Sequence, residues 1–552
     1  MPDESHRGAT RRELIAAAGA SAVALSAGMG LAEPPVLASG FVFEGNGYRR
    51  PGDRGIPGVM VSNGTDVVLT DAEGRWRLPV SEGDSVFVIK PPQWSIACGP
   101  GGIPHCSYLH QTRGTPSDLQ LWHGGIAPTG PLPVSIDFGL QRQAESSRFE
   151  ALLLADTQPA NDLELGYLRD DIIAGVLGTD AAFGINHGDV VFDDLALYPR
   201  YLQMLSATQI PWHHCPGNHD LNSEARDDAY SRETWKRVFG PRRHAFRYAD
   251  ATFILLDNVY YFGHNPGAQR SGQYCGLIGA SQLQFVRNVL ANVPRDQLIV
   301  LSMHIPLTTY ANPENPADNT ADHLALLDLL AGRPHTVSFS GHMHQTEHHY
   351  LACSSSGGTQ RLHHHHVLTA ASGGWWGGPR DRRGIPFADS VDGNPNGYHV
   401  LMVDGSGYET RFVPAIGKVV GQMRAVVCDL HGGRAASSAE PIAADRLLQC
   451  KLVVNVFDGG PRTSVAYEIA GHNSGPVPMN RVAAPDPFFV ESFAKHASAQ
   501  KAWVRPGTSS HLWEAPLQAS LGAGVHRVTV RAVDEYGREQ LSHVALEVSA
   551  HA

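Results

Sequence analysis

The stretch Pro216-Gly217-Asn218-His219-Asp220 determines how the rest of this chain is interpreted. It follows an apolar run from Ile210 to Cys215, and its glycine permits a sharp backbone turn. An Asn next to a His adds little to stability in such a turn, which indicates a chemical role. Four further segments share this polar character: Asp156-Thr157-Gln158, Gly188-Asp189, His304 and Gly341-His342-Met343-His344.

Each polar segment follows a predicted apolar strand, as Asp156 follows Phe149–Ala155 and His304 follows Leu298–Met303. Helical periodicity occurs between the strands, over Leu195–Leu205, Ser281–Leu290 and Asp322–Leu330. Strands that alternate with helices predict an α/β architecture. In such sheets the loops beyond the carboxyl ends of the strands share one rim, where ligands bind. We therefore expect the polar segments to meet at one site.

The residue types in these segments are those of a metal centre. Borderline divalent cations bind imidazole nitrogens and carboxylate or amide oxygens. Two such ions, held roughly 3.5–4 Å apart, need a bridging carboxylate, and Asp189 is predicted to provide it. Asp156 and Gln158 are alternate residues beyond a strand, so both face the first ion, to which His344 also points. The predicted donors to the second ion are Asn218, His304 and His342.

The order of the segments resembles the pattern of the calcineurin-like metallophosphoesterases: Asp-x-His, Gly-Asp, Gly-Asn-His-Asp/Glu, a lone His and Gly-His-x-His. All of these blocks occur in that order between Phe149 and Met402. Phe239-Gly240-Pro241 and the segment 392–398 resemble one subgroup, in which β-domains flank the catalytic domain. The resemblance implies a metallophosphoesterase-type α/β core with flanking helices, preceded by a small β-sandwich and followed by a second β-sandwich-like domain.

The resemblance also implies a binuclear centre of Mn, Fe or Zn ions and a small phosphomonoester or phosphodiester as substrate. A hydroxide between the metals would attack phosphorus, and His219, oriented by Asp220, would protonate the leaving oxygen. Gln158 departs from the family pattern, because its amide oxygen replaces the usual imidazole and is a harder, weaker ligand. We expect lower affinity or an altered metal preference at the first ion, with activity retained.

Four parts of the chain are predicted from these patterns: an export signal over 1–32, a β-sandwich over 38–140, the catalytic domain over 148–410 and a C-terminal β-domain over 411–552. Arg11-Arg12 before a mild apolar run, Leu14 to Ala27, resembles a twin-arginine export signal and implies a periplasmic or secreted protein. That run is too short and too weakly apolar for a transmembrane helix, so no stable membrane insertion is expected.

The formal net charge of −11 argues against a nucleic-acid partner, because such proteins usually carry a basic surface. An alternative interpretation is a cell-envelope protein that binds glycan through its β-domains and retains a vestigial metal centre. Gln158 leaves this interpretation open, whereas the complete second donor set and His219 argue against it.

Other conspicuous residues have two interpretations each. The tract His363–His366 resembles a metal-binding run, but a strand with alternating faces is the favoured interpretation. Trp375-Trp376 either stacks on a substrate ring or packs against the C-terminal domain. Among the seven cysteines, Cys98 with Cys106 or Cys428 with Cys450 are possible disulfides, and buried free thiols are the alternative.

Overall fold

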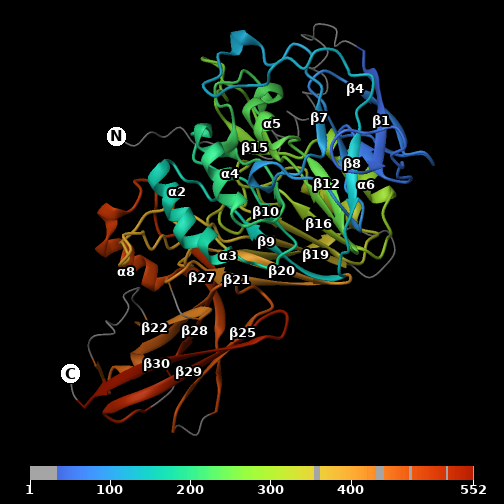
Figure 1. Ribbon diagram of the computed structural model, residues 1–552. Helices are drawn as coiled ribbons and strands as arrows, with labels where there is room; N and C mark the ends of the chain where they lie inside the picture. The colour runs from blue at the N-terminus through green and yellow to red at the C-terminus, as the bar shows by residue number, and fades with distance from the viewer. Residues whose placement is uncertain are drawn as a thin grey trace.

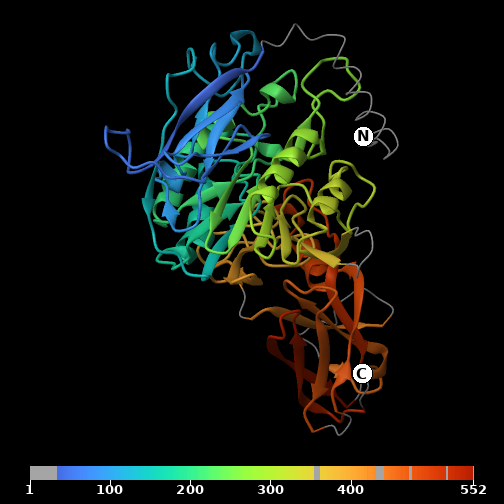
Figure 2. The same ribbon diagram turned by 90° about the vertical axis from the view of Figure 1, so that its right-hand side faces the viewer.

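The computed structural model describes residues 34–353, 361–418, 421–430, 441–471, 475–517 and 520–550. A central α/β body carries a β-rich domain near each end of the chain (Figure 1). The C-terminal β-domain projects from this body on the side away from the N-terminal β-domain (Figure 2). The expected export signal over 1–32 lies outside the described residues.

The α/β body contains two large sheets with largely parallel central strands. The five-stranded sheet has the order β11 (Trp212–His214), β10 (Phe183–Asn186), β9 (Arg148–Leu154), β20 (Gly397–Asp404) and β21 (Gly407–Pro414). The six-stranded sheet has the order β12 (His244–Tyr248), β13 (Ala251–Leu255), β16 (Leu298–Ser302), β17 (Thr336–Ser340), β19 (Arg361–Val367) and β18 (Glu347–Cys353).

Alternation along β9 shows how the layers form, because successive strand residues point to opposite faces. Ala151 and Leu153 pack into the core between the two sheets, with Phe253 of the second sheet. Leu152 and Leu154 pack instead against the helices on the outer side. These are α2 (Asp162–Leu168), α3 (Ala174–Val176) and α4 (Tyr198–Ser206), whereas α6 (Ala280–Ala291) and α7 (His323–Leu330) cover the other sheet. The result is a helix–sheet–sheet–helix sandwich, and the predicted α/β class is confirmed.

The N-terminal β-domain has two four-stranded sheets around one core. The first contains β4 (Arg75–Val80), β1 (Val36–Glu44), β8 (Phe138–Arg142) and β6 (Trp94–Ser95). The second contains β3 (Val67–Leu69), β2 (Met60–Ser62), β5 (Ser85–Ile89) and β7 (Ser107–Leu109). Phe87 of β5 reaches beyond this domain and packs edge-on against Phe285 of α6, so the domain rests on the catalytic body.

The C-terminal β-domain also contains two sheets around a shared core. One has the order β22 (Met423–Asp429), β24 (Cys450–Val456), β28 (Thr508–Pro516) and β27 (Asn480–Pro485). The other has the order β23 (Ile442–Ala443), β30 (Glu539–Ser549), β29 (Gly524–Val533), β25 (Ser464–Ile469) and β26 (Val477–Pro478). The boundary predicted between 410 and 411 falls inside β21. This strand pairs with β20 from Gly407 to Pro414, so the catalytic sheet continues past the predicted boundary.

Two of the open interpretations are decided by the fold. The His363–His366 tract lies in β19, where His363 and His365 contact Ser338 and the alternate His364 and His366 face the other way. All of the cysteines are free thiols, and five of them are buried.

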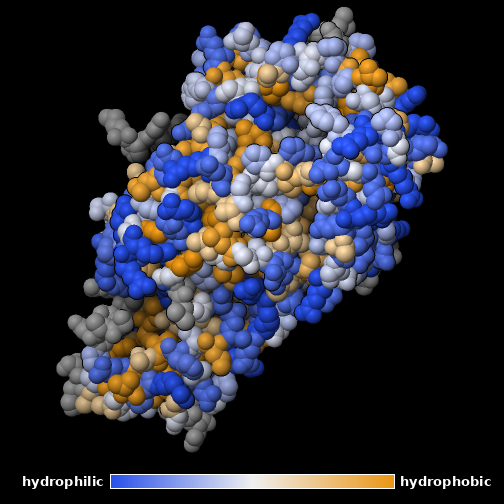
Figure 3. Space-filling view, viewed as in Figure 1, coloured by the Kyte–Doolittle hydropathy of each residue, from blue (hydrophilic) through white to orange (hydrophobic). Residues whose placement is uncertain are grey.

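In the part of the chain that the structure describes, no helix is long and apolar enough to cross a bilayer. Figure 3 shows hydrophilic residues over most of one face, with apolar residues gathered in a broken band across its middle.

Candidate metal centre

The predicted donor segments lie together because five parallel strands deliver them to one rim. Asp156 follows the end of β9, Asp189 follows β10, Asn218 follows β11, His304 follows β16 and His342 follows β17. Each side chain comes only a few residues after its strand ends. Strand ends at a shared rim are where α/β sheets place ligands. The structure thus brings together segments that are far apart in the sequence.

One half of the centre is grouped around His304. Its Nε2 atom lies 3.3 Å from Oδ2 of Asp189, 2.9 Å from Oδ1 of Asn218 and 3.2 Å from Nδ1 of His342. His304 and Asp189 are buried, whereas His342 and Asn218 are partly exposed. Four donors therefore converge on one small volume, as predicted for the second ion.

The other half contains Asp156, Gln158 and His344, all of them buried. Nε2 of His344 lies 3.8 Å from Oδ1 of Asp156. The amide nitrogen of Gln158 donates a 2.7 Å hydrogen bond to Oδ2 of Asp189. Asp189 thus contacts donors of both halves, which is the position that a bridging carboxylate requires.

The backbone of the donors is held in an unusual conformation. Asp156, Gln158, Asp189, His342 and His344 have φ angles of 49°, 36°, 51°, 75° and 49°. Residues other than glycine seldom adopt this left-handed region, and those that do cluster at functional sites.

Glycines beside the donors allow the close approach of backbone and side chains. A Cβ atom on Gly217 would lie 2.1 Å from Oδ1 of Asp189, and one on Gly341 would lie 2.4 Å from Oδ2 of Asp156. The structure therefore has no space for a side chain at either position.

The pKa values of the acidic and imidazole groups in the centre depend on burial and on one another's charges. Burial raises the pKa of Asp156 to about 7. Burial also favours neutral His304, but Asp189 outweighs it and raises the pKa of His304 to about 9. Burial lowers the pKa of His344 to about 3, so this imidazole is neutral and able to ligate. An unpaired buried carboxylate is costly, and cations between these groups would relieve that cost.

Several details test whether the residues fit two divalent cations. Oε1 of Gln158 is buried and has no hydrogen-bond partner, and a half-turn of the amide would present it to an ion beside Asp189. Nδ1 of His304 lies 2.8 Å from the carbonyl oxygen of His187, and Nδ1 of His344 contacts the carbonyl oxygen of Gly373. Such contacts fix the tautomer that leaves Nε2 free for a metal. The donor set therefore fits.

Asp318 is a contact that sequence reasoning missed. Its Oδ1 lies 3.2 Å from Nε2 of His342, which leaves Nδ1 of the same ring facing His304. A carboxylate behind a ligating imidazole orients the ring and raises its basicity. Asp318 lies in the long connection between β16 and α7, far from any of the quoted motifs, so no sequence signal identified it.

The predicted role of Asp220 needs correction. Its carboxylate accepts hydrogen bonds from the backbone of Gly217 and Val190 and from the hydroxyl of Tyr198. It therefore holds the turn and does not contact the ring of His219. The residue that does so is Asp193, whose Oδ1 lies 2.7 Å from Nδ1 of His219.

Aromatic side chains surround the open side of the centre. Trp376 is buried and donates its N–H to the carbonyl oxygen of Thr157, so it packs the core. Trp375 stacks on His344 with ring centroids 3.8 Å apart. Phe192 stacks on His219 at 4.5 Å, and Trp503 of the C-terminal domain stacks on Phe192 at 5.6 Å. The open side of the centre therefore has an aromatic wall from two domains.

Comparisons with known proteins agree with this geometry. The sequence model of the family described as calcineurin-like phosphoesterase matches residues 152–346. The family model described as the N terminal of calcineurin-like phosphoesterase matches residues 44–118, and the one described as its C terminal matches residues 365–539. This chain belongs to the calcineurin-like phosphoesterase family, in the form with N-terminal and C-terminal extension domains.

A curated relative is named a probable cyclic nucleotide phosphodiesterase, from Psychrobacter arcticus. The two are 28% identical over 165 residues, which is 28% of this chain and 54% of the relative, so the chain spans about half of the relative's length. A purple acid phosphatase from yellow lupin (Lupinus luteus) seeds matches at 12% identity and a TM-score of 0.33, over 68% of this chain and 71% of that one.

Proposed function

We propose that the protein is a metal-dependent phosphoric ester hydrolase that acts on a small phosphomonoester or phosphodiester. The observation that carries the proposal is that Asp189 contacts His304 in one group of predicted donors and Gln158 in the other. When bound, two divalent cations supply a nucleophilic water of lowered pKa and neutralise charge on the phosphoryl oxygens. This complete donor set favours the hydrolase over the glycan-binding alternative.

His219 is proposed as the general acid. Asp193 occupies its Nδ1 atom, so Nε2 is the atom that would hold a transferable proton. Burial lowers the pKa of His219, but Asp189 and Asp193 outweigh burial and leave the pKa above its ordinary value. A protonated imidazole near the centre is the form that donates to a leaving oxygen.

The aromatic wall formed by Phe192, Trp375 and Trp503 favours a substrate whose leaving group is planar. Trp503 is 52% exposed, although it stacks face to face on Phe192, and Phe192 in turn covers His219. A ring on the leaving group would lie against this wall while its oxygen faces His219. The name of the relative from Psychrobacter arcticus, a probable cyclic nucleotide phosphodiesterase, supports the same class of substrate.

Hydrolysis of p-nitrophenyl phosphate and bis-p-nitrophenyl phosphate tests the proposal. The purified chain, loaded with Mn²⁺, should release p-nitrophenol from at least one ester, and EDTA should abolish the release. Asp189→Asn is the matched variant, because it keeps the shape of the side chain while removing the charge. A metal-loaded chain without activity on a broad ester panel, or full activity in Asp189→Asn, would contradict the proposal.

Export by a twin-arginine-type signal is part of the proposal. It is supported by Arg11-Arg12 and the following apolar run, Leu14 to Ala27. The test fuses residues 1–40 to a reporter that functions only after export in the folded state. Replacing both arginines with lysine should stop export while leaving reporter synthesis unchanged, and continued export of this variant would contradict the signal.

A further inference from the structure

A second group of histidines and carboxylates joins the catalytic body to the C-terminal β-domain. His348, His366 and His399 come from β18, β19 and β20, on the two catalytic sheets. Asp458 lies just beyond the end of β24, in the C-terminal domain. The three imidazoles are buried, and the side chain of Asp458 is 11% exposed. No part of the proposed hydrolytic chemistry uses this group.

The strand register accounts for the placement of the histidines. His348 and His366 are direct partners in the antiparallel pair of β18 and β19, and direct partners share a sheet face. Their rings stack with centroids 4.0 Å apart. His399 approaches from the other sheet, with its ring nearly perpendicular to that of His366. Two sheets thus present imidazoles to one carboxylate of the neighbouring domain.

The distances resemble those between ligands of one ion. The Nε2 atoms of His348, His366 and His399 lie 3.3, 2.9 and 3.0 Å from Oδ1 of Asp458. Ligand atoms about 2.0–2.1 Å from a tetrahedral zinc ion are separated by about 3.3 Å. The donor atoms of His348, His366 and Asp458 all lie within 4.8 Å of one another, so these three residues need only a small rearrangement to hold such an ion.

Hydrogen bonds alone do not satisfy this group. Nε2 of His399 is hydrogen-bonded to Oδ1 of Asp458, and Nε2 of His348 is hydrogen-bonded to the backbone carbonyl oxygen of Asp458. Nε2 of His366 lies 2.9 Å from Oδ1 of Asp458 without the geometry of a hydrogen bond, so both ring nitrogens of this fully buried side chain lack a hydrogen-bond partner. Buried polar atoms are normally paired. A cation coordinated by Nε2 of His366 would supply the partner that the protein does not.

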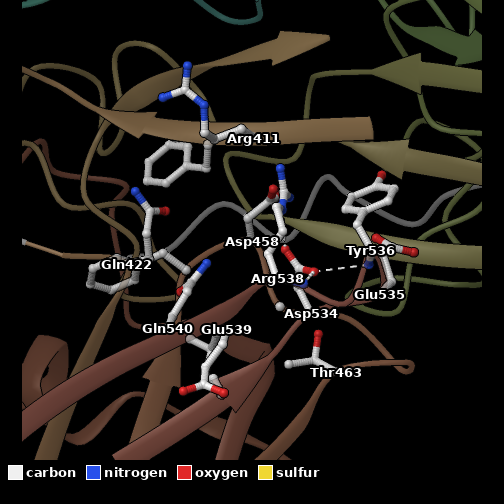
Figure 4. Close-up of a pocket in the computed structure, with 15 residues that line it drawn as sticks. Arg411, Gln422, Asp458, Thr463, Asp534, Glu535, Tyr536, Arg538, Glu539 and Gln540 are labelled. Carbon is white, nitrogen blue, oxygen red and sulfur yellow. Dashed lines mark hydrogen bonds and ion pairs between the residues drawn. The ribbon is translucent and has the colours of Figure 1, made fainter. Parts of the chain in front are cut away.

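The surroundings of the group are also those of a metal site. Nδ1 of His348 lies 2.9 Å from Nε2 of His364 and 3.2 Å from Oε1 of Glu535, and a carboxylate near the second ring nitrogen is a contact that supports a metal ligand. Asp458 has a φ of 64°, in the same left-handed region as the predicted donors of the candidate metal centre around Asp189. Asp458 and Glu535 both line a hollow between the C-terminal domain and β21 of the catalytic body (Figure 4), which gives an ion a route to the group.

We propose that His348, His366 and Asp458 bind a further divalent cation. His399, whose Nε2 lies 3.0 Å from Oδ1 of Asp458, would complete the ligand set by a shift of its ring. Three imidazoles and one carboxylate in a closed, buried arrangement suit zinc in a structural role. The ion would fasten the C-terminal domain to the catalytic body, since its ligands come from both. This inference is independent of the proposed hydrolase activity.

Zinc content of the full chain tests the inference. Every protein in the comparison carries Asp189→Asn and His304→Ala, which remove metal binding at the candidate metal centre around Asp189. In this background the chain should bind about one zinc ion after dialysis, and His366→Gln should remove it. His363→Gln is the matched control, because His363 is equally buried on the same strand but faces the opposite way. It should retain the ion.

Thermal unfolding gives a second readout. Zinc should raise the melting temperature of the background protein and of His363→Gln, but should leave that of His366→Gln unchanged. If His366→Gln fails to fold, the background protein still decides the matter, because a chelator must lower both its zinc content and its melting temperature. Absence of bound zinc from the background protein, or equal zinc in His366→Gln and His363→Gln, would overturn the inference.

Discussion

Nδ1 of His219 lies 2.7 Å from Oδ1 of Asp193, a residue in the loop that also carries Asp189. The negative charge of Asp193 helps to keep the pKa of His219 above its ordinary value, against the opposing effect of burial. The same loop that carries Asp189 thereby orients the ring and favours its protonated form.

Replacing Asp193 should change the pH profile of the enzyme. Asp193→Asn removes a charge that stabilises the imidazolium, so the pKa of His219 falls and its proton is lost at lower pH. The alkaline limb of the kcat profile should move down by about one pH unit, whereas Asp193→Glu should retain most of the parent profile. The measurement is kcat between pH 5 and pH 10, and an alkaline limb unchanged in Asp193→Asn would contradict this role.

Asn218 and His219 are neighbours with different predicted roles. Asn218→Ala should lower metal content, because Oδ1 of Asn218 lies 2.9 Å from the donor atom of His304. His219→Ala should keep its metals and reduce kcat by roughly 10²–10⁴-fold, most for esters with poor leaving groups. Metal analysis together with rates on esters of graded leaving-group pKa separates the two. Equal metal loss in both variants would show that the division of roles is wrong.

Trp503 should determine affinity for aromatic esters. Trp503→Ala removes the exposed ring that stacks on Phe192, and kcat/KM for p-nitrophenyl esters should fall roughly 3- to 10-fold. Alkyl esters should be affected much less. Trp122→Ala is the control, since Trp122 is 76% exposed in the N-terminal domain. An equal loss on aromatic and alkyl esters would argue against stacking.

Arg232 and Asp257 form a buried ion pair that supports the turn at Gly217. Arg232 pairs with both oxygens of Asp257 and donates a 2.9 Å hydrogen bond to the carbonyl oxygen of Gly217. Asp257→Asn leaves the guanidinium without its counter-charge, so the free energy of unfolding should fall by about 3–5 kcal/mol. Denaturant unfolding at pH 7 measures this, and a loss below about 1 kcal/mol would contradict it.

The same pair gives a pH dependence of known sign. Burial raises the pKa of Asp257, but Arg232 and Arg242 outweigh burial and hold the pKa below its ordinary value. The unfolded chain therefore binds the proton more readily than the folded one. The stabilisation is present above about pH 4 and is lost as the pH falls through the folded pKa. Acid unfolding of Asp257→Asn should accordingly show a weaker pH dependence than that of the parent.

The grouping of the predicted donors at one rim could be foreseen from the sequence, because each follows an apolar strand within a few residues. Asp156, Asp189 and His304 follow β9, β10 and β16, and parallel strands deliver such residues to one rim. The strand pattern that reveals the fold therefore also locates these residues. The helices over Ser281–Leu290 and Asp322–Leu330 were predictable for a similar reason, because their apolar periodicity is complete.

The remaining contacts depend on distances that no local pattern encodes. Asp193 replaced Asp220 as the partner of His219, because the carboxylate of Asp220 is turned back onto its own loop. Asp318 and Trp503 reach the centre from a long connection and from another domain. The boundary predicted after residue 410 falls inside β21, whose pairing with β20 is a contact between strands that the local sequence does not encode.

The aromatic wall divides the work of the protein between its domains. All predicted metal donors belong to the α/β body, whereas Trp503 comes from the C-terminal domain. Under the proposed function, substitutions in the C-terminal domain should alter which ester is accepted while leaving the predicted metal donors in place. Relatives that exchange or reshape this domain could diversify in substrate while keeping a constant reaction, and a laboratory exchange of C-terminal domains would follow the same route.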